Sequence, residues 1–346
     1  MKYARIICTI LAVLAPAAVG NVLAGAKTEK LRIVTTTTDL KSIAQAIGGE
    51  KVSVTSIATG YENPHYVQAK PSFMMLARKA DLWIRVGLEL EIGYEELIID
   101  GSRNSEIRIG KPGHLDASEK VLRLEVPKTR VTRELGDVHP QGNPHYWLDP
   151  LNARIVAGSI AKRLIKLSPE NIKVFEKNLA VFRKALDERM FGAVLVKKVG
   201  GGKLWAMELK GTLNEYITAQ KLTDDLGGWL ARMRPLKGGK IITHHRSWSY
   251  FVNRFGLTVV AELEPKPGVP PSGSHLLKVM KLAKAHGVGV ILLEPAYSRK
   301  AADLVARKTG ANVVVCAISV GGQKQAADYL TLIDLIVDRI SKAAKR

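Results

Sequence analysis

Cysteine is almost absent from the sequence, which excludes a disulfide framework. The 346 residues contain two cysteines, Cys8 and Cys316. Cys8 lies in an N-terminal segment that we expect to be removed, so the mature chain would keep a single thiol and form no intrachain disulfide. Folds that depend on disulfides are therefore excluded. No cysteine comes directly after the expected cleavage site, which argues against a lipoprotein anchor.

Long hydrophobic runs are also scarce, and the clearest one lies at the start of the chain. Lys2 and Arg5 precede an apolar run over residues 6–19 that Pro16 interrupts, and Ala24-Gly25-Ala26 supplies the small residues of a signal-peptidase site. The run is short for a membrane span and contains a proline, so an export signal fits better than a retained helix. We therefore expect residues 1–26 to be a cleaved signal peptide and the mature protein to be periplasmic.

Aromatic residues are few, and acidic residues do not balance the basic ones. Aromatic residues make up 6% of the chain, and its formal net charge is +20. A strongly basic chain is compatible with nucleic-acid or membrane-surface binding. Here the basic residues are scattered and have no interleaved aromatic residues for base stacking. The pattern favours a solvated basic surface, and we expect no nucleic-acid partner.

Short apolar strands alternate with helices in both halves of the chain. This alternation predicts an α/β fold with parallel sheets and functional loops at the strand ends. Residues 107–116 and 121–134 look irregular, and Asp39 is a candidate N-cap for the first helix. The expected strands cover residues 31–34, 52–57, 81–86, 240–243, 257–261, 289–293 and 312–315. The expected helices cover residues 40–47, 72–80, 151–167, 274–286, 301–309 and 328–343.

A long amphipathic stretch separates the two halves. Its apolar residues recur at helical spacing, and Gly200 follows it; they are Phe175, Leu179, Phe182, Leu186 and Met190. We expect one helix over residues 168–199, about 30 residues and ~45 Å long at roughly 1.5 Å per residue. The predicted organisation is a signal peptide (1–26), an N-terminal lobe (27–167), a connecting helix (168–199) and a C-terminal lobe (200–346).

Histidines occupy loops in three distant segments. His65 and His145 each follow an Asn-Pro pair, and His244-His245 follows the strand expected over residues 240–243. Proline restricts the backbone on both sides of itself, so the first two imidazoles are held on stiff, non-helical segments. Glu294 also stands at a strand end. Three imidazoles and a carboxylate suit zinc first, with manganese or iron as alternatives. Ordinary loop histidines are the competing interpretation.

The other histidines in loops have simpler interpretations. His139 precedes a proline and can recruit metal transiently, but a surface-loop histidine is the favoured interpretation. His114, in a glycine-rich stretch, is interpreted in the same way. Trp147 and Trp248 are expected to pack around the site rather than to contact a ligand.

Several motifs taken together resemble a known family over essentially the whole mature chain. They are Asn63-Pro64-His65, the run from Asn143 to Pro150, His245 with Tyr250-Phe251 and Phe255-Gly256-Leu257, and Glu294-Pro295. They are similar to the zinc/manganese-type solute-binding proteins of bacterial ABC importers (cluster A-I). The resemblance implies two α/β lobes joined by one long helix, with metal bound between them by His65, His145 and His245. His245 is preferred to His244 because of its distance from Tyr250-Phe251.

The chain departs from the family pattern at the fourth ligand. Many members place an aspartate after the strand near the C-terminus, where this chain has Cys316-Ala317-Ile318-Ser319. Glu294 is the expected replacement. A water molecule in the fourth position, with Glu294 structural, and a Cys316 thiolate are the alternatives.

The resemblance implies a periplasmic receptor that delivers a divalent metal, zinc first, to an ABC permease. We expect a monomer and no enzymatic activity. A zinc-dependent hydrolase is one alternative, because Glu294 can act as its general base if it is not a ligand. No His-Glu-x-x-His pattern is present, which lowers its weight. A metal-dependent adhesin is the other alternative, since it would share the same site and differ in its partner.

Overall fold

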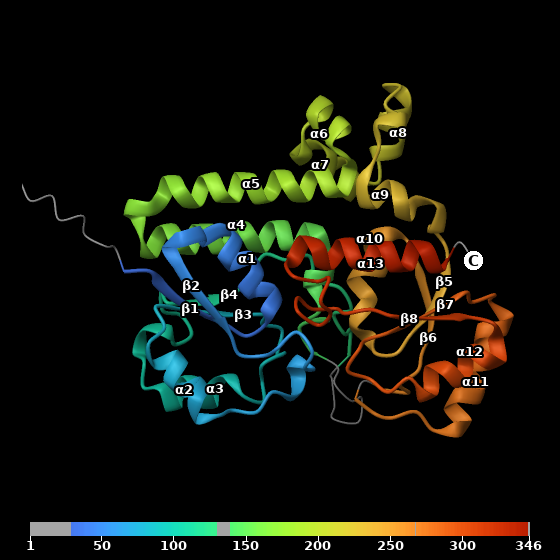
Figure 1. Cartoon of the computed structure of the whole chain (residues 1–346), viewed down its shortest axis with the longest axis horizontal. Coiled ribbons are helices and arrows are strands. Elements are labelled where there is room, and N and C mark those ends of the chain that lie inside the picture. The colour runs from blue at the N-terminus through green and yellow to red at the C-terminus, as the bar shows by residue number, and fades with distance from the viewer. Residues whose placement is uncertain (1–28, 130–138, 267, 345–346) are drawn as a thin grey trace, which may run out of the picture.

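The computed structural model describes residues 29–129, 139–266 and 268–344. Two four-stranded parallel sheets lie side by side, each inside its own lobe (Figure 1). The expected α/β architecture with two lobes is therefore confirmed. The predicted signal peptide lies outside the described residues. Among the helices within these ranges, none combines the length and the apolar character that a membrane crossing requires.

The sheet of the first lobe has the strand order β2-β1-β3-β4. Its strands are β1 (Leu31–Thr35), β2 (Val52–Ser56), β3 (Leu82–Arg85) and β4 (His114–Asp116). Its helices are α1 (Thr38–Gly48), α2 (Pro71–Arg78), α3 (Glu95–Ser102) and α4 (Pro150–Leu167). β4 lies in a stretch predicted to be irregular, because three residues are too few for an alternating pattern. It pairs in parallel with β3, the buried strand beside it.

The second sheet repeats the arrangement of the first, with the order β6-β5-β7-β8. Its strands are β5 (Lys240–Thr243), β6 (Thr258–Glu262), β7 (Val290–Leu293) and β8 (Asn312–Val315). Its helices are α10 (Ser249–Phe255), α11 (Gly273–Ala285), α12 (Lys300–Thr309) and α13 (Tyr329–Ala343). In parallel sheets the strands end at one common edge, so loops from both lobes can meet between the sheets.

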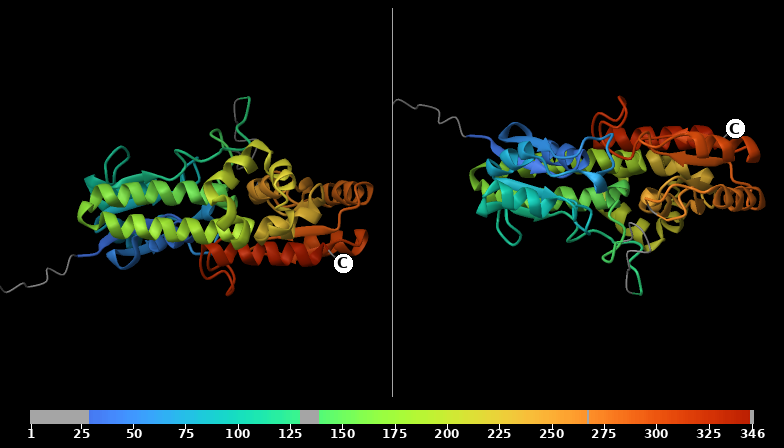
Figure 2. Two further views of the ribbon diagram at one scale, coloured as in Figure 1. Left: turned by 90° about the horizontal axis from the view of Figure 1, so that it is seen from above. Right: turned by 90° about the horizontal axis from the view of Figure 1, so that it is seen from below.

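The connecting helix α5 (Ile172–Phe191) is shorter than predicted. It runs beside α4 and reaches from the first lobe toward the second (Figures 1 and 2). The chain breaks at Gly192, where φ is 88° and an added Cβ would lie 2.7 Å from Cα of Gly227. The expectation of one helix to residue 199 is therefore wrong, because this close backbone contact is invisible to apolar spacing. Four short helices follow, α6 (Ala193–Val199), α7 (Gly201–Lys210), α8 (Leu213–Ala219) and α9 (Gly228–Met233).

The two lobes share one hydrophobic core and several buried polar contacts. The core cluster includes β1, α4, α5, α10 and α13. The segment around Trp147 carries much of the polar contact: Trp147 Nε1 donates to Ile318 O at 2.7 Å, and Tyr329 Oη donates to Trp147 O at 2.6 Å. Arg254 of α10 pairs with Asp149, the N-cap of α4. These contacts fix the loop that carries His145 against the second lobe.

Asp39 does not cap α1, contrary to expectation. Thr37 is the N-cap, and its side chain accepts from Leu40 N. Asp39 lies in the first turn instead, fully buried, where its Oδ1 accepts from Val320 N of the other lobe at 3.0 Å. Burial raises the pKa of Asp39 to about 7. The Asp39 carboxyl therefore joins the two lobes, and its contribution to the stability of the protein depends on pH.

The wild-type protein is expected to lose stability as pH rises, and Asp39→Asn is expected to abolish this loss. The folded pKa of about 7 lies above the ordinary value, so the folded chain keeps a proton that the unfolded chain releases. The free energy of unfolding therefore falls as pH rises from about 4 to about 7, at roughly 1.4 kcal/mol per unit. Asparagine keeps an acceptor for Val320 N and titrates no proton.

Urea unfolding at pH 5 and pH 8 measures this difference. The variant should gain about 2–3 kcal/mol relative to the wild type between the two pH values. Asp100→Asn, which changes an exposed carboxyl on α3, is the matched control. If Asp39→Asn changed the free energy of unfolding by the same amount at pH 5 and at pH 8, the raised pKa of Asp39 would be contradicted.

Candidate metal centre

His65 is presented by a short turn that its own neighbours build. The residues Pro64–Tyr66 form a 3₁₀ turn after β2, with Pro64 in its first position. Asn63 caps the turn, and its Oδ1 accepts from His65 N at 3.0 Å. Asparagine readily makes this local bond to a backbone N–H two residues on, and proline fixes φ at the start of the turn. The sequence Asn-Pro-His therefore orients the imidazole through local chemistry.

The second Asn-Pro-His motif holds His145 in the same way, with one further bond. Asn143 Oδ1 accepts from His145 N at 2.9 Å and also lies 2.9 Å from His145 Nδ1. An amide oxygen can only accept, so Nδ1 carries the proton and Nε2 is the lone-pair nitrogen of the neutral ring. His145 is 3% exposed. This arrangement prepares its Nε2 to bind a metal ion.

His245 follows β5 and is oriented by a carboxylate from the neighbouring strand. Its Nδ1 lies 2.7 Å from Oε2 of Glu264, which follows β6 and is buried. The carboxylate accepts the Nδ1 proton, so Nε2 is again the metal-binding nitrogen. Glu264 was not among the predicted site residues. Its position just after a strand adjacent to β5 is the signal that could have indicated it.

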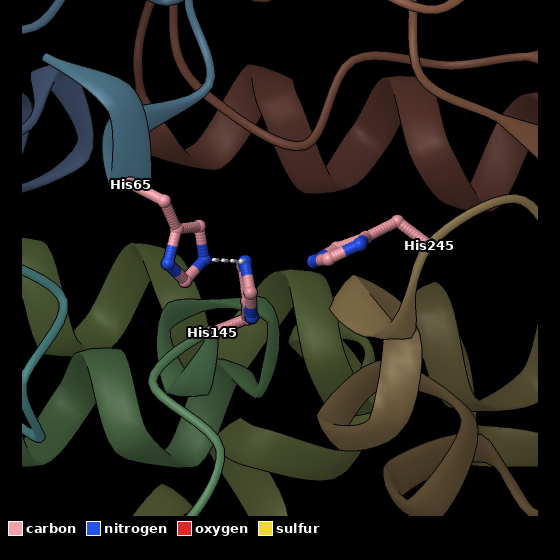
Figure 3. Close-up of side chains that lie close together, drawn as sticks. All are labelled: His65, His145 and His245. Atoms are coloured by element: carbon pink, nitrogen blue, oxygen red, sulfur yellow. Dashed lines mark hydrogen bonds between the residues drawn. The ribbon is translucent and has the colours of Figure 1, made fainter. Parts of the chain in front are cut away.

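The structure brings His65, His145 and His245 together from both lobes. Their ligand atoms all lie within 4.8 Å of one another, and Figure 3 shows the three rings turned toward a common point. Nε2 of His65 and Nε2 of His145 are 3.4 Å apart. Two nitrogens bound to zinc at about 2.05 Å with a tetrahedral angle would be about 3.3 Å apart. The spacing of these two imidazoles therefore fits a shared zinc ion.

The surroundings keep these imidazoles in the form that binds metal. Burial lowers the pKa of His65 well below its ordinary value, and nearby histidines lower it further. The same two causes lower the pKa of His145. A neutral imidazole has a lone pair to donate, whereas a protonated one has none. The cluster is therefore ready for a cation without first losing protons from these two rings.

Glu294 lies beside the three imidazoles but outside their close group. It follows β7, is 3% exposed, and lines one pocket with His145 and His245. Its Oε1 accepts from Trp248 Nε1 at 3.0 Å, whereas its buried Oε2 accepts no hydrogen bond from any residue in the described ranges. Burial raises the pKa of this carboxyl to about 7. A role for Glu294 as the fourth ligand stays a prediction.

The remaining candidate residues either lie outside the close group or have a protonation state that does not suit metal binding. The His244 ring packs on Tyr297 with centroids 4.2 Å apart, and it is not in the close group. Cys316 is buried, which raises the pKa of its thiol to about 12 and disfavours a thiolate. His114 was expected in a surface loop, but it lies buried on β4 with Nε2 3.2 Å from Glu95 Oε1. The Trp147 ring packs 5.2 Å from that of His145.

Glu264→Gln is expected to lower metal affinity by about 10–100-fold, the usual effect of losing a partner that orients a ligand. Glutamine removes the negative charge that raises the basicity of His245 and accepts its Nδ1 proton. Competition titration with a zinc chelator measures the affinity. Glu262→Gln, which changes the last residue of β6 and removes a pairing with Arg246, is the matched control and should change little. Equal affinities in the two variants would contradict this role.

Comparison with known proteins gives one consistent family. The family model for the periplasmic component A of zinc-uptake complexes (ZnuA) matches residues 33–190 and 216–343. The iron-binding protein YfeA of Yersinia pestis is 26% identical over 324 residues, covering 91% of this chain and 86% of that protein. The high-affinity zinc uptake protein ZnuA of Bacillus subtilis is 24% identical over 317 residues, covering 90% and 86% respectively.

Solved structures agree on the fold. A crystal structure of ZnuA superposes with a TM-score of 0.64 at 20% identity, covering 91% of this chain and 99% of that one. Proteins of this kind are periplasmic or lipoprotein substrate-binding components rather than enzymes. Because the family model spans most of the sequence and the three imidazoles meet between the lobes, this chain belongs to the ZnuA family of periplasmic zinc-uptake components.

Proposed function

We propose that this chain binds a divalent transition metal between its lobes and delivers it to the membrane permease of an ABC importer. The observation that carries the proposal is the group formed by His65, His145 and His245, whose ligand atoms lie within 4.8 Å of one another. In this proposal residues 1–26 direct export and are then removed. The mature protein acts in the periplasm as a monomer.

Zinc is the first choice of metal. Imidazole nitrogen suits zinc and iron, whereas manganese prefers oxygen donors. Relatives named for zinc, iron and manganese all resemble this chain, so iron and manganese stay as alternatives. The tetrahedral spacing of two Nε2 atoms and the three-histidine donor set favour zinc.

Glu294 is proposed as the carboxylate donor to the same ion. A buried oxygen without a hydrogen-bond partner is costly, and a cation would compensate for it. Among the described residues, Oε2 of Glu294 is such an atom, and Glu294 lines the same pocket as His145 and His245. Glu294→Gln tests this role, because glutamine can still accept from Trp248 but is a much weaker ligand. A purely structural role predicts unchanged metal affinity in this variant.

Metal analysis of the mature protein tests the central proposal. The wild type should bind about one zinc per chain, and the triple variant His65→Ala, His145→Ala, His245→Ala should bind none. His286→Ala, which removes an exposed histidine at the end of α11, is the control and should bind like the wild type. Substoichiometric metal in the wild type, or unchanged affinity in the triple variant, would remove the proposal.

Delivery to a permease requires a test in cells. Deleting the gene should impair growth when zinc is scarce, and the wild-type chain should restore it. The triple histidine variant should be exported at the same level without restoring growth. If the triple variant restored growth, the cellular role of the protein would not depend on the metal centre.

A further inference from the structure

Two loops from opposite lobes form walls of the metal pocket. Residues 60–64 of the first lobe and residues 294–297 of the second lobe line the pocket together with His145 and His245. The pocket has a volume of about 30 Å³. One water molecule needs roughly 10–15 Å³ of such space, so an ion with very little water fits between the loops. The positions of the two loops therefore determine whether the centre is enclosed.

Two side-chain hydrogen bonds join these loops across the boundary between the lobes. Tyr61 Oη donates to Pro295 O at 3.1 Å, and Asn63 Nδ2 donates to Tyr297 Oη at 3.2 Å. Both bonds lie within a few residues of His65, the ligand that this first-lobe loop carries. The loop that presents His65 is therefore attached to the second lobe.

Asn63 transmits the contact with Tyr297 to a metal ligand. Its Oδ1 accepts from His65 N at 3.0 Å, while its Nδ2 donates to Tyr297 Oη. The two bonds use the oxygen and the nitrogen of one planar amide, so a rotation that breaks one bond also weakens the other. The Tyr297 hydroxyl therefore helps to fix the amide of Asn63, and this amide fixes the turn that carries His65.

The Tyr297 ring is itself positioned by the ligand-bearing segments of the second lobe. Its centroid lies 4.2 Å from that of His244 and 6.2 Å from that of His245. Its backbone N donates to Glu294 O at 3.1 Å, so the ring also follows the turn that begins at Glu294. The hydroxyl that meets Asn63 therefore reports where the second lobe's part of the centre lies.

The first-lobe loop has space on its outer side. A hollow of about 340 Å³ lies there, and its lining includes Asn63, Tyr66 and Phe73. Asn63 lines both this hollow and the metal pocket. If the bond to Tyr297 is lost, the Asn63 side chain has room to turn outward, away from the position that orients His65.

We propose that Tyr297 is a positioning residue that sets how long the ion stays bound, because it makes the orientation of His65 depend on the second lobe. This inference rests on the proposed function of the same site. His65 is the least buried of the three imidazoles, so it is the ligand that can leave first. Separation of the two loops would break the bond between Asn63 and Tyr297 and release the His65 turn.

Tyr297→Phe tests this role because it removes the hydroxyl and keeps the ring that packs on His244. Zinc dissociation, followed by stopped-flow transfer to a chelator, should become about 3–10-fold faster, the equivalent of one ordinary hydrogen bond. The association rate should change by less than about 2-fold, since such changes act mainly on dissociation. Tyr216→Phe on α8, which removes a hydroxyl that accepts from Lys203 Nζ, is the matched control and should behave like the wild type.

Two further measurements separate positioning from a general structural role. Hydrogen exchange of the His65 amide in the metal-free protein should be faster in Tyr297→Phe than in the wild type, because Asn63 Oδ1 then holds this N–H less firmly. A double-mutant cycle of Tyr297→Phe with Asn63→Ala should be non-additive in the dissociation rate. Without the Asn63 amide, the Tyr297 hydroxyl has no path to His65.

The outcomes separate this inference from the proposed function. Unchanged zinc dissociation in Tyr297→Phe, or an equal rise in Tyr216→Phe, would overturn the role of Tyr297 while leaving the three-histidine centre intact. Additive effects of Tyr297→Phe and Asn63→Ala would overturn it as well, because the hydroxyl would then act through another contact. A wild-type protein that binds no zinc would refute the proposed function. The exchange of the His65 amide needs no metal, and no acceleration in Tyr297→Phe would refute the positioning role by itself.

Discussion

Arg254→Met is expected to destabilise the protein by about 3–5 kcal/mol, the usual cost of removing one partner from a buried ion pair. Arg254 of α10 donates from Nε and Nη2 to the two carboxylate oxygens of Asp149, at 2.8 and 2.7 Å. The two side chains are 7% and 4% exposed. Methionine fills much of the space but leaves the Asp149 carboxylate buried without its cation. Asp149 also caps α4 through Leu151 N, so the loss affects both lobes.

Thermal and urea unfolding measure this effect. A loss of about 3–5 kcal/mol corresponds to a fall in Tm of roughly 10 °C for a chain of this size. Arg232→Met removes an exposed ion pair with Asp338 and should cost less than about 1 kcal/mol. The double variant Asp149→Asn, Arg254→Met should recover part of the stability because it buries no charge. Equal losses in Arg254→Met and Arg232→Met would contradict this account.

Much of the fold could be predicted because local sequence patterns determine it. Every strand expected from an apolar run is present, and both halves form parallel sheets of the same strand order. The wrong predictions arise where contact with a distant segment determines where a helix begins or ends. Gly192 ends α5 because its backbone meets Gly227, and Asp39 leaves the cap position to Thr37 because its carboxylate meets Val320 N. Neither contact leaves a trace in the local pattern.

The candidate site likewise contains residues that local sequence positions and residues that distant contacts position. The two Asn-Pro-His motifs orient their imidazoles through bonds within the motif, so the sequence alone indicates His65 and His145. His244 and His245 are adjacent, and side chains alternate along extended backbone. Which of them faces the other lobe depends on how β5 is placed, and local residues cannot decide it. Glu264 reaches the site because β6 pairs with β5, a pairing that no local pattern shows.

His145→Ala is expected to lower zinc affinity by at least about 100-fold. Four ligands share a binding free energy of roughly 10–16 kcal/mol in structural zinc sites, so one ligand contributes about 3 kcal/mol. His145 is also the most enclosed of the three histidines, at 3% exposure. Chelator competition measures the affinity. The melting temperature of the metal-free protein shows whether the variant is folded.

A double-mutant cycle with Asn143 makes this prediction specific. Asn143 Oδ1 accepts from Nδ1 of His145, so Asn143→Ala alone should weaken zinc binding by loosening the ring and changing its tautomer. In the His145→Ala background the same change has no imidazole to act on, so it should lower affinity no further. Additive losses would instead mean that Asn143 acts through its bond to Arg246 O across the lobes. The cycle therefore distinguishes orientation of one ligand from closure of the interface that surrounds it.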